Sequence, residues 1–568
     1  MTTYKAPGVY TEEISTFPPS VAEVSTAIPA FIGCTENTNM ENGKPPVPTR
    51  ISTLLEYTER FGGAKNEDVT VTISGDEVTG VTPPSLEFLM FYSLDMYFKN
   101  GGGPCYIVSV GDYNSAASKA DIEAGLTALK KEDEPTLIVL TDAVKLSDTD
   151  YNSLCQTALM QCKELKDRFC IFDIKDGDDG EKFRNGIGTN NLKYGAAYYP
   201  YIKTALNFPY TDDSVTVTGL SLSGDTTAEY ETGINGVRIF YTKTGNDTTT
   251  TLKTIIEEGT TANIGFAIDD SVADAKKLTI SLPQGTTKNP SSATPTALVN
   301  AWSSWKNNNA NDAKGFDIQK AGKGLASVTP KAEFDLKYAK DLGNADAGAK
   351  YTLQEFQYDK TALYNKIKLA LDQEKIVLPP SSAIAGVYAS VDRDSGVWKA
   401  PANVSLNSVT GPVVRLNNAD QEDLNIDINS GKSINAIRAF AGKGTIVWGA
   451  RTLAGNDNEW RYISVRRLFN MVEESVQKST AFAVFEPNTA MTWLKVRSMI
   501  EGYLDGLWRE GALAGAAADQ AFFVNVGLGT TMTTKDINEG RMNIEIGLAA
   551  VRPAEFIILK FSHKLQES

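Results

Sequence analysis

Thr136-Leu137-Ile138-Val139-Leu140 is an almost uninterrupted run of strand-forming apolar residues. A strand whose side chains are apolar on both faces is typical of a parallel sheet that is covered by other layers on both sides. Strand-like and helix-like segments alternate around this run, with strands expected at 105–110, 169–172 and 194–201 and helices at 121–130 and 147–165. This βαβα order predicts an α/β layer with a largely parallel sheet.

Beyond this layer the composition shifts toward Thr, Ser, Asn and Gly. Residues 207–328 contain short alternating stretches, such as Ser214–Thr218, Val237–Tyr241 and Leu278–Leu282, separated by turn residues. Alternation with a period of two is the pattern of half-buried strands. It predicts an inserted, mainly β domain at the surface, with one helix at Thr296–Trp305.

The last part of the chain returns to mixed structure. Helices are expected at 353–373, 461–478 and 491–510, the last capped by Asn488 or Thr489, and strands at 521–526, 543–548 and 555–561. The first residues are predicted to form an extended arm, because Pro7, Gly8, Pro18, Pro19 and Pro29 interrupt any helix there.

The sequence therefore predicts an α/β and α+β multidomain fold with an inserted β-rich surface domain and extended arms at both ends. A chain of 568 residues exceeds the size of a single core, so several domains are expected. We expect an N-terminal arm at 1–30, an α/β domain in two parts at 31–206 and 329–385, the inserted outer domain at 207–328, and a C-terminal core domain with its terminal strand at 386–568.

Composition and charge exclude several classes of protein. No apolar run approaches the ~20 residues of a membrane span, and the N-terminus lacks the apolar region of a secretory signal, which predicts cytoplasmic synthesis without membrane insertion. The net charge of −15 disfavours direct binding of nucleic acid, whose phosphates need a basic surface. The cysteines, odd in number and without a Cys-x-x-Cys pair, are predicted to be reduced and mostly buried: Cys34, Cys105, Cys155, Cys162 and Cys170.

Motifs for catalysis are absent or incomplete. The single histidine, His563, lies five residues before the last residue of the sequence, which disfavours any mechanism that needs a positioned imidazole. Three glycine-rich stretches lack the spacing of a phosphate loop and are predicted to be turns: Gly101-Gly102-Gly103-Pro104, Gly431-Lys432-Ser433 and Gly442-Lys443-Gly444-Thr445. We therefore expect no enzyme activity, no cofactor and no metal site.

Two charged clusters have plain structural interpretations. Asp392-Arg393-Asp394 is predicted to be a solvated turn rather than a cation site. Arg461, Arg466 and Arg467 are surrounded by acids and are predicted to pair with carboxylates across a subunit contact rather than to bind phosphate.

Several stretches, taken together and in order, resemble the contractile tail sheath family. They are Ala6-Pro7-Gly8-Val9-Tyr10-Thr11-Glu12-Glu13-Ile14, Thr26-Ala27-Ile28-Pro29-Ala30-Phe31-Ile32-Gly33, Pro379–Gly386, Gly396-Val397-Trp398-Lys399-Ala400-Pro401-Ala402-Asn403, Asn435–Arg438, Gly444–Leu453 and Pro553-Ala554-Glu555-Phe556. The stretch Asn100–Tyr113 is similar to the sheaths of extracellular contractile injection systems of the antifeeding-prophage type.

The resemblance implies a structural subunit that polymerises into a helical sheath around an inner tube and drives that tube outward by contracting. The implied partners are further copies of the chain, the inner tube protein, and baseplate and terminal cap proteins. Assembly would occur in the cytoplasm, and the sheath would then be part of a phage-tail-like particle that is released or associated with a virion. A sheath of a contractile phage tail is the alternative. An α/β enzyme and a secreted adhesin are remote ones.

The resemblance also implies where subunits join. The N-terminal strand (Val9, Tyr10, Thr11, Glu12 and Ile14) and the C-terminal strand (Phe556, Ile557, Ile558 and Leu559) would add to a neighbouring subunit's sheet through backbone hydrogen bonds. Ordinary edge strands paired within one chain are the other interpretation. Lys495, Arg497 and Arg509 on the helix at 491–510 are candidates for a surface facing the tube, or else charges that merely face solvent.

Overall fold

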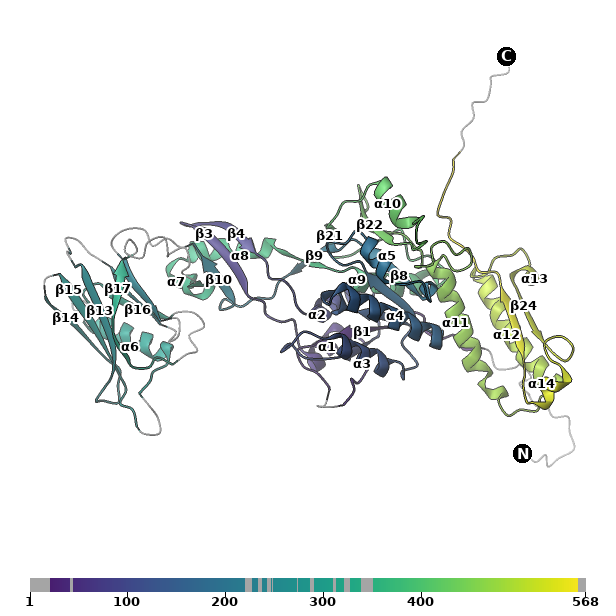
Figure 1. Cartoon of the computed structure of the whole chain (residues 1–568), viewed down its shortest axis with the longest axis horizontal. Helices are drawn as coiled ribbons and strands as arrows, with labels where there is room; N and C mark the ends of the chain where they lie inside the picture. The colour runs from purple at the N-terminus through teal and green to yellow at the C-terminus, as the bar shows by residue number, and fades with distance from the viewer. Residues whose placement is uncertain are drawn as a thin grey trace, which may run out of the picture. The chain divides into compact units, whose positions relative to one another are not determined.

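The computed structural model describes residues 21–40, 44–219, 227–232, 237–242, 247, 249–272, 274–286, 291–309, 313–320, 327–338 and 351–559 (Figure 1). The chain forms two compact units, one from residues 1–64, 87–205 and 377–568, the other from 65–86 and 206–376. The chain passes between the units inside β9 (Ile202–Asn207) and β19 (Lys375–Leu378) as well as near residues 64 and 86.

The larger unit is built on a nine-stranded sheet in the order β2-β5-β1-β6-β7-β8-β22-β23-β20. The inner strands from β5 to β22 run parallel, as predicted. The strands are β1 (Pro29–Gly33), β2 (Thr49–Ile51), β5 (Cys105–Ser109), β6 (Leu137–Leu140), β7 (Phe169–Asp173), β8 (Gly195–Tyr199), β20 (Val404–Ser405), β22 (Asn435–Phe440) and β23 (Gly444–Trp448). A separate strand, β21 (Val409–Pro412), pairs with the first residues of β9.

Helices cover both faces of this sheet, which explains its apolar strands. They are α1 (Leu54–Phe61), α2 (Met90–Lys99), α3 (Lys119–Leu129), α4 (Asp148–Leu165), α5 (Glu181–Gly186), α9 (Ser381–Ser395) and α10 (Asn418–Asn425). In β1, the ring of Phe31 lies 5.2 Å from that of Tyr97 on α2. The next residue, Ile32, points to the opposite face, where α3 packs so closely that a Cβ at Gly125 would lie 2.8 Å from the Ile32 side chain.

Local sequence sets the bounds of these helices. Ser118 and Asp121 form a reciprocal capping box at the start of α3, and Ser147 caps α4. Helix α4 ends where Lys166 adopts a left-handed conformation, with φ of 62°. Asp392-Arg393-Asp394, predicted as a solvated turn, lies inside α9, so that prediction was wrong.

The five cysteines are all buried, as predicted. Burial raises the pKa of the Cys34 thiol to about 12, so this thiol is unreactive at neutral pH. No helix among the described segments is long and apolar enough to cross a membrane.

The C-terminal part of the larger unit contains α11 (Ile463–Ser479), α12 (Ala490–Arg509), α13 (Ala518–Ala521), β24 (Phe522–Val526), α14 (Thr534–Asn538) and β25 (Ile544–Leu548). Thr489 occupies the cap position of α12, as one of the two predicted candidates, although its side chain makes no capping hydrogen bond. Figure 1 shows α11, α12 and β24 beside one another. Their facing side chains form one core, which includes Leu468, Val496, Ile500 and Val524.

The smaller unit contains two sheets, each with its own core. A four-stranded sheet, β18-β10-β3-β4, packs against α7 (Phe356–Asp359) and α8 (Thr361–Gln373). Its strands are β3 (Val69–Ser74), β4 (Glu77–Thr82), β10 (Val215–Thr218) and β18 (Tyr351–Thr352). A seven-stranded sheet, β14-β15-β13-β17-β11-β12-β16, packs against α6 (Pro295–Asn308) around the buried Trp302. Its strands are β11 (Thr227–Thr232), β12 (Val237–Thr242), β13 (Thr251–Glu258), β14 (Gly265–Val272), β15 (Ala275–Leu282), β16 (Phe316–Lys320) and β17 (Lys331–Tyr338).

Two features of the smaller unit differ from the expectation. The helix predicted at 353–373 is interrupted at Lys360, whose φ of −132° and ψ of 51° are not helical. The unit's bounds also differ from the predicted insertion at 207–328, because β3 pairs with β10 and thereby adds residues 65–86 to this unit.

Asp173 at the end of β7 gives the larger unit a pH-dependent stability. Its carboxylate accepts the Ser381 amide at the start of α9 at 2.7 Å, and burial raises its pKa to about 7. Because the folded pKa exceeds the unfolded value, the stability from this group is present below about pH 4 and is lost as pH rises through about 7.

Asp173→Asn mimics the neutral acid and keeps an oxygen acceptor. We expect the variant to be more stable than the native chain at pH 8, by on the order of 2 kcal/mol, with the difference vanishing near pH 4. Urea unfolding from pH 4 to pH 8 measures this. Asp176→Asn, at an exposed position nearby, is the control, and a variant less stable than the native chain at pH 8 would refute the assignment.

Candidate functional site

The two-stranded sheet of β24 and β25 has unpaired outer edges within the described part of the chain. The strands are antiparallel, with Val524 opposite Ile546. The Ala549 amide donates to the Ala521 carbonyl at 2.8 Å, so alternate residues of β25 direct their backbone groups toward β24. It follows that the N–H and C=O groups of Ile544, Ile546 and Leu548 face the outer edge.

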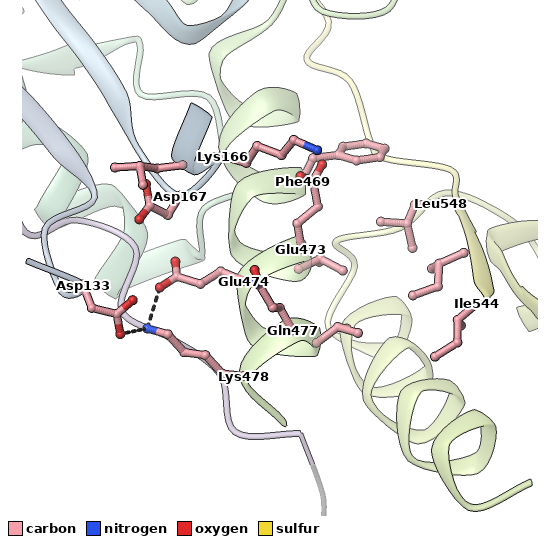
Figure 2. Close-up of a pocket in the computed structure, with 14 residues that line it drawn as sticks. Asp133, Lys166, Asp167, Phe469, Glu473, Glu474, Gln477, Lys478, Ile544 and Leu548 are labelled. Carbon is pink, nitrogen blue, oxygen red and sulfur yellow. Dashed lines mark hydrogen bonds and ion pairs between the residues drawn. The ribbon is translucent and has the colours of Figure 1, made fainter. Parts of the chain in front are cut away.

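A groove runs between this edge and α11 (Figure 2). Ile544, Ile546 and Leu548 form one wall, and three α11 side chains, Phe469, Val472 and Val476, contribute to the other. The groove encloses about 800 Å³. A strand lying in it could bond to the edge of β25 and bury apolar side chains against α11.

Charged side chains line the rest of this groove, with more carboxylates than ammonium groups. The carboxylates are Asp133, Asp167, Glu473 and Glu474, and the ammonium groups are Lys166 and Lys478. Lys478 Nζ lies 2.7 Å from both Asp133 Oδ2 and Glu474 Oε1. Burial raises the pKa values of Asp167 and Glu474. Glu473 and Asp167 are also paired with Arg466 and Arg168, at 2.9 and 3.2 Å, so charges around the groove are balanced and its apolar walls decide what it can hold.

The predicted C-terminal strand has no partner in the described part of the chain. Residues 551–559 lie outside the named strands, and the exposed fractions of Phe556, Ile557, Ile558 and Leu559 are 68%, 80%, 78% and 72%. Four adjacent apolar side chains that are largely exposed form a surface that a soluble chain covers by association. The other interpretation of this segment was a strand paired within the same chain. Residues 556–559 form no such pair with the described residues.

The predicted N-terminal strand, with Val9, Tyr10, Thr11, Glu12 and Ile14, lies outside the described residues. The part that follows it is fixed along α11. The Ala22 and Val24 amides donate to the Ser479 and Ser475 hydroxyls at 3.2 and 3.1 Å. The arm therefore approaches the core beside α11, the helix that also forms one wall of the groove.

Two of the three arginines in the basic cluster at 461–467 form ion pairs within the chain. Arg467 is 3% exposed, and its guanidinium forms an ion pair with Asp392, which also accepts the Thr26 hydroxyl at 2.6 Å. Arg466 is 2% exposed and lies 2.9 Å from Glu473. The predicted pairing across a subunit contact was wrong for these two residues, because each pairs with a carboxylate of its own chain.

The three tube-facing candidates lie on the exposed side of α12, away from the core. Lys495 Nζ lies 4.7 Å above the ring of Phe482. Arg497 pairs with Glu501 at 2.7 Å and Arg509 with Asp505 at 2.9 Å, each one turn along the helix. The charges of both arginines are therefore balanced locally.

The glycine-rich stretches are turns, as predicted. Gly101, Gly431, Gly442 and Gly444 all have positive φ values, which glycine adopts without strain. Lys432, the lysine of the most suggestive stretch, is 5% exposed and donates to the Arg184 carbonyl, so it is committed to the fold. His563 lies outside the described residues.

Comparisons with known proteins find similarity to tail sheath proteins. A family model described as "Phage tail sheath C-terminal domain" matches residues 455–564, which contain α11, α12, β24 and β25. The "Tail sheath protein" of Vibrio phage KVP40 is 31% identical over 153 residues, and this match spans 27% of the chain but only 21% of that relative.

Two solved structures match almost the full length. The sheath complex of the extracellular contractile injection system PVC, in its contracted state, is 25% identical, with a TM-score of 0.54 and 99% of both chains covered. The helical sheath of the anti-feeding prophage in its contracted state is 27% identical, with a TM-score of 0.54 over 99% of this chain and all of that one. The chain is thus similar over almost its full length to sheath subunits of contractile injection systems, and residues 455–564 match the phage tail sheath C-terminal domain.

Proposed function

We propose that the chain polymerises into a helical contractile sheath around an inner tube, and that contraction drives the tube through a target membrane. The observation that carries the proposal is the combination of an exposed apolar C-terminal segment with a sheet edge that no described residue pairs with and that a groove flanks. Each subunit both offers a strand and can accept one. Such head-to-tail contacts do not close on themselves, so they generate a helix of subunits.

Apolar character favours one arm for the groove beside β25. The C-terminal arm continues from Phe556–Leu559 into Lys560, His563 and Lys564, so it is apolar and then basic. The predicted N-terminal strand is less apolar, because it carries Glu12 and Glu13. We assign the C-terminal arm of a neighbouring subunit to the edge of β25 and the N-terminal arm of another to the outer edge of β24.

Strand addition also suits a sheath that must move. Backbone hydrogen bonds at strand edges tie subunits together while the rigid cores rotate against one another. The extended lattice is held by a kinetic barrier, and a baseplate signal releases it into a shorter lattice with more buried contact. The free-energy difference between the two lattices does the work on the tube, which needs no catalytic group in the subunit.

The full-length structural matches favour an injection-system sheath over a phage-tail sheath. Assembly in the cytoplasm, followed by incorporation into a tail-like particle with a baseplate and a terminal cap, is the corresponding setting. Electron microscopy of the purified full-length chain tests the proposal: striated hollow cylinders are expected. A chain that stays monomeric across protein concentrations and salt conditions, with both arms intact, would contradict it.

We assign the tube-facing surface to the exposed side of α12. Replacing Lys495, Arg497 and Arg509 together by glutamine should weaken tube binding, most clearly at low salt, because screening reduces the contribution of exposed charges at high salt. Folding stability should change by less than about 1 kcal/mol, since exposed ion pairs contribute little. Co-sedimentation with preformed tubes measures the effect.

Lys535→Gln combined with Arg541→Gln is the matched control, because both residues are exposed cations on another element of the same region. Native-like tube binding by the α12 triple variant would remove that surface from the assignment and would leave the proposal of strand addition untouched.

A further inference from the structure

Arg451 and Glu555 join two of the sequence stretches that pointed to the sheath family. Arg451 Nε and an amino group of its guanidinium lie 2.8 and 2.6 Å from the two carboxylate oxygens of Glu555, which is a two-point contact. The Arg451 side chain is 4% exposed, and that of Glu555 is 21% exposed. The pair is thus mostly withdrawn from water, and its geometry is fixed by both hydrogen bonds.

Neighbouring polar groups hold both partners. Asn435 accepts the Arg451 amide at 2.8 Å and donates to the Arg451 carbonyl at 2.8 Å. Glu555 also accepts from Asn425 Nδ2 at 2.8 Å and from the Tyr462 hydroxyl at 3.3 Å. Burial opposes ionisation of Glu555, but these donors outweigh it and lower the pKa of its carboxyl. The contact is therefore ionised and fixed at neutral pH.

The contact lies where the chain leaves the core. The Val551 amide donates to the Ala512 carbonyl at 3.2 Å, and this is the last backbone–backbone hydrogen bond of the C-terminal segment among the described residues. Pro553 has no N–H to offer. Glu555 is then anchored by its side chain, and directly after it come the exposed residues Phe556–Leu559.

We infer that Arg451 is a positioning residue that holds Glu555 and so fixes the point from which the C-terminal arm departs. The inference rests on the proposed exchange of strands. With Glu555 held, the arm departs from residue 555 itself. Without it, the next fixed point is Val551, and the free arm lengthens by about 13 Å.

A longer free arm weakens the link between subunits. The effective concentration of a tethered strand at its acceptor falls as the tether lengthens, and the strand then reaches its acceptor from many directions. If the arm leaves each core from a variable position, the neighbouring subunit that binds it is also held at a variable position in the helical lattice. By holding Glu555, Arg451 thereby makes the lattice more regular and improves the transfer of force between subunits.

The test separates positioning from folding. Glu555→Gln alone leaves a buried guanidinium without its counter-ion and should lower the melting temperature. Arg451→Met combined with Glu555→Gln removes both charges and should restore the melting temperature to near the native value. The double variant is still expected to form at least about tenfold fewer ordered cylinders than the native chain, because its arm is no longer anchored.

Two further variants fix the interpretation. Lys130→Met with Glu164→Gln removes an exposed ion pair of 2.6 Å elsewhere in the same unit and should assemble normally. A chain ending at Glu555 tests the exchange itself. If that truncated chain fails to assemble while the Arg451/Glu555 double variant assembles like the native chain, the positioning role is refuted alone. If the truncated chain assembles normally, strand donation by this arm is refuted as well.

Discussion

Deleting residues 556–568 is expected to abolish cylinder formation while leaving the monomer folded. The four side chains from Phe556 to Leu559 are 68–80% exposed, so their loss removes little packing within the chain. Folding stability should change by less than about 1 kcal/mol, as for other surface changes. In the assembly, burying four such side chains contributes roughly 6–12 kcal/mol per contact, so their removal weakens each contact by several orders of magnitude.

Sedimentation velocity and electron microscopy of the truncated chain measure this loss. Ile557→Val with Ile558→Val is the matched control, because it keeps two β-branched apolar residues and the full backbone. The control should assemble, and the truncated chain should remain a folded monomer with a native melting curve. Cylinders of native length from the truncated chain would mean that the arm does not join subunits.

Ile546→Pro is expected to block assembly from the acceptor side. The Ile546 amide faces the outer edge of β25, so proline removes a hydrogen-bond donor that the chain itself does not use in the ladder with β24. Proline is tolerated in edge strands when the missing N–H would have faced outward. The variant should fold yet fail to pair with an incoming strand.

Ile546→Ala is the matched control for this variant. It loses a similar part of the side chain but keeps the amide, so any cost of lost packing is common to both. We expect similar melting temperatures for the two variants and cylinders only from the alanine variant. Equal assembly of both would show that no strand bonds to this edge.

Some of this organisation follows from local pattern alone. The apolar run at 137–140 forms an inner parallel strand because both of its faces are covered, as its composition indicates. The helical spacing of Val496, Ile500 and Leu507 places these residues in the core under β24 and β25. Each of these predictions depends only on which faces of one element are apolar.

Other features depend on contacts between distant segments. Strand β3 pairs with β10, more than 140 residues further along the chain, and no periodicity indicates that pairing. The arginines at 466 and 467 have the composition of a surface patch but are buried, because Glu473 and Asp392 lie beside them in the fold. Charge clusters in a sequence do not reveal where their partners are.

The candidate site was predictable in part. The run of apolar residues Phe556–Leu559 is visible in the sequence and indicates a strand that needs a partner. The groove that could accept it is formed by α11 and β25, about 70 residues apart, and its shape follows only from their packing against α12. The anchoring of Glu555 by Arg451 likewise appears only when segments 104 residues apart are brought together.

Cross-linking within assembled cylinders tests the exchange of C-terminal arms most directly. One subunit carries Ile558→Cys in its arm, a second carries Gln477→Cys in the groove, and the five native cysteines are buried and do not compete. Under mild oxidation, cylinders that contain both subunits should yield a covalent dimer joined between the two introduced cysteines, and cylinders of either variant alone should not. Well-formed mixed cylinders without that dimer would contradict the account.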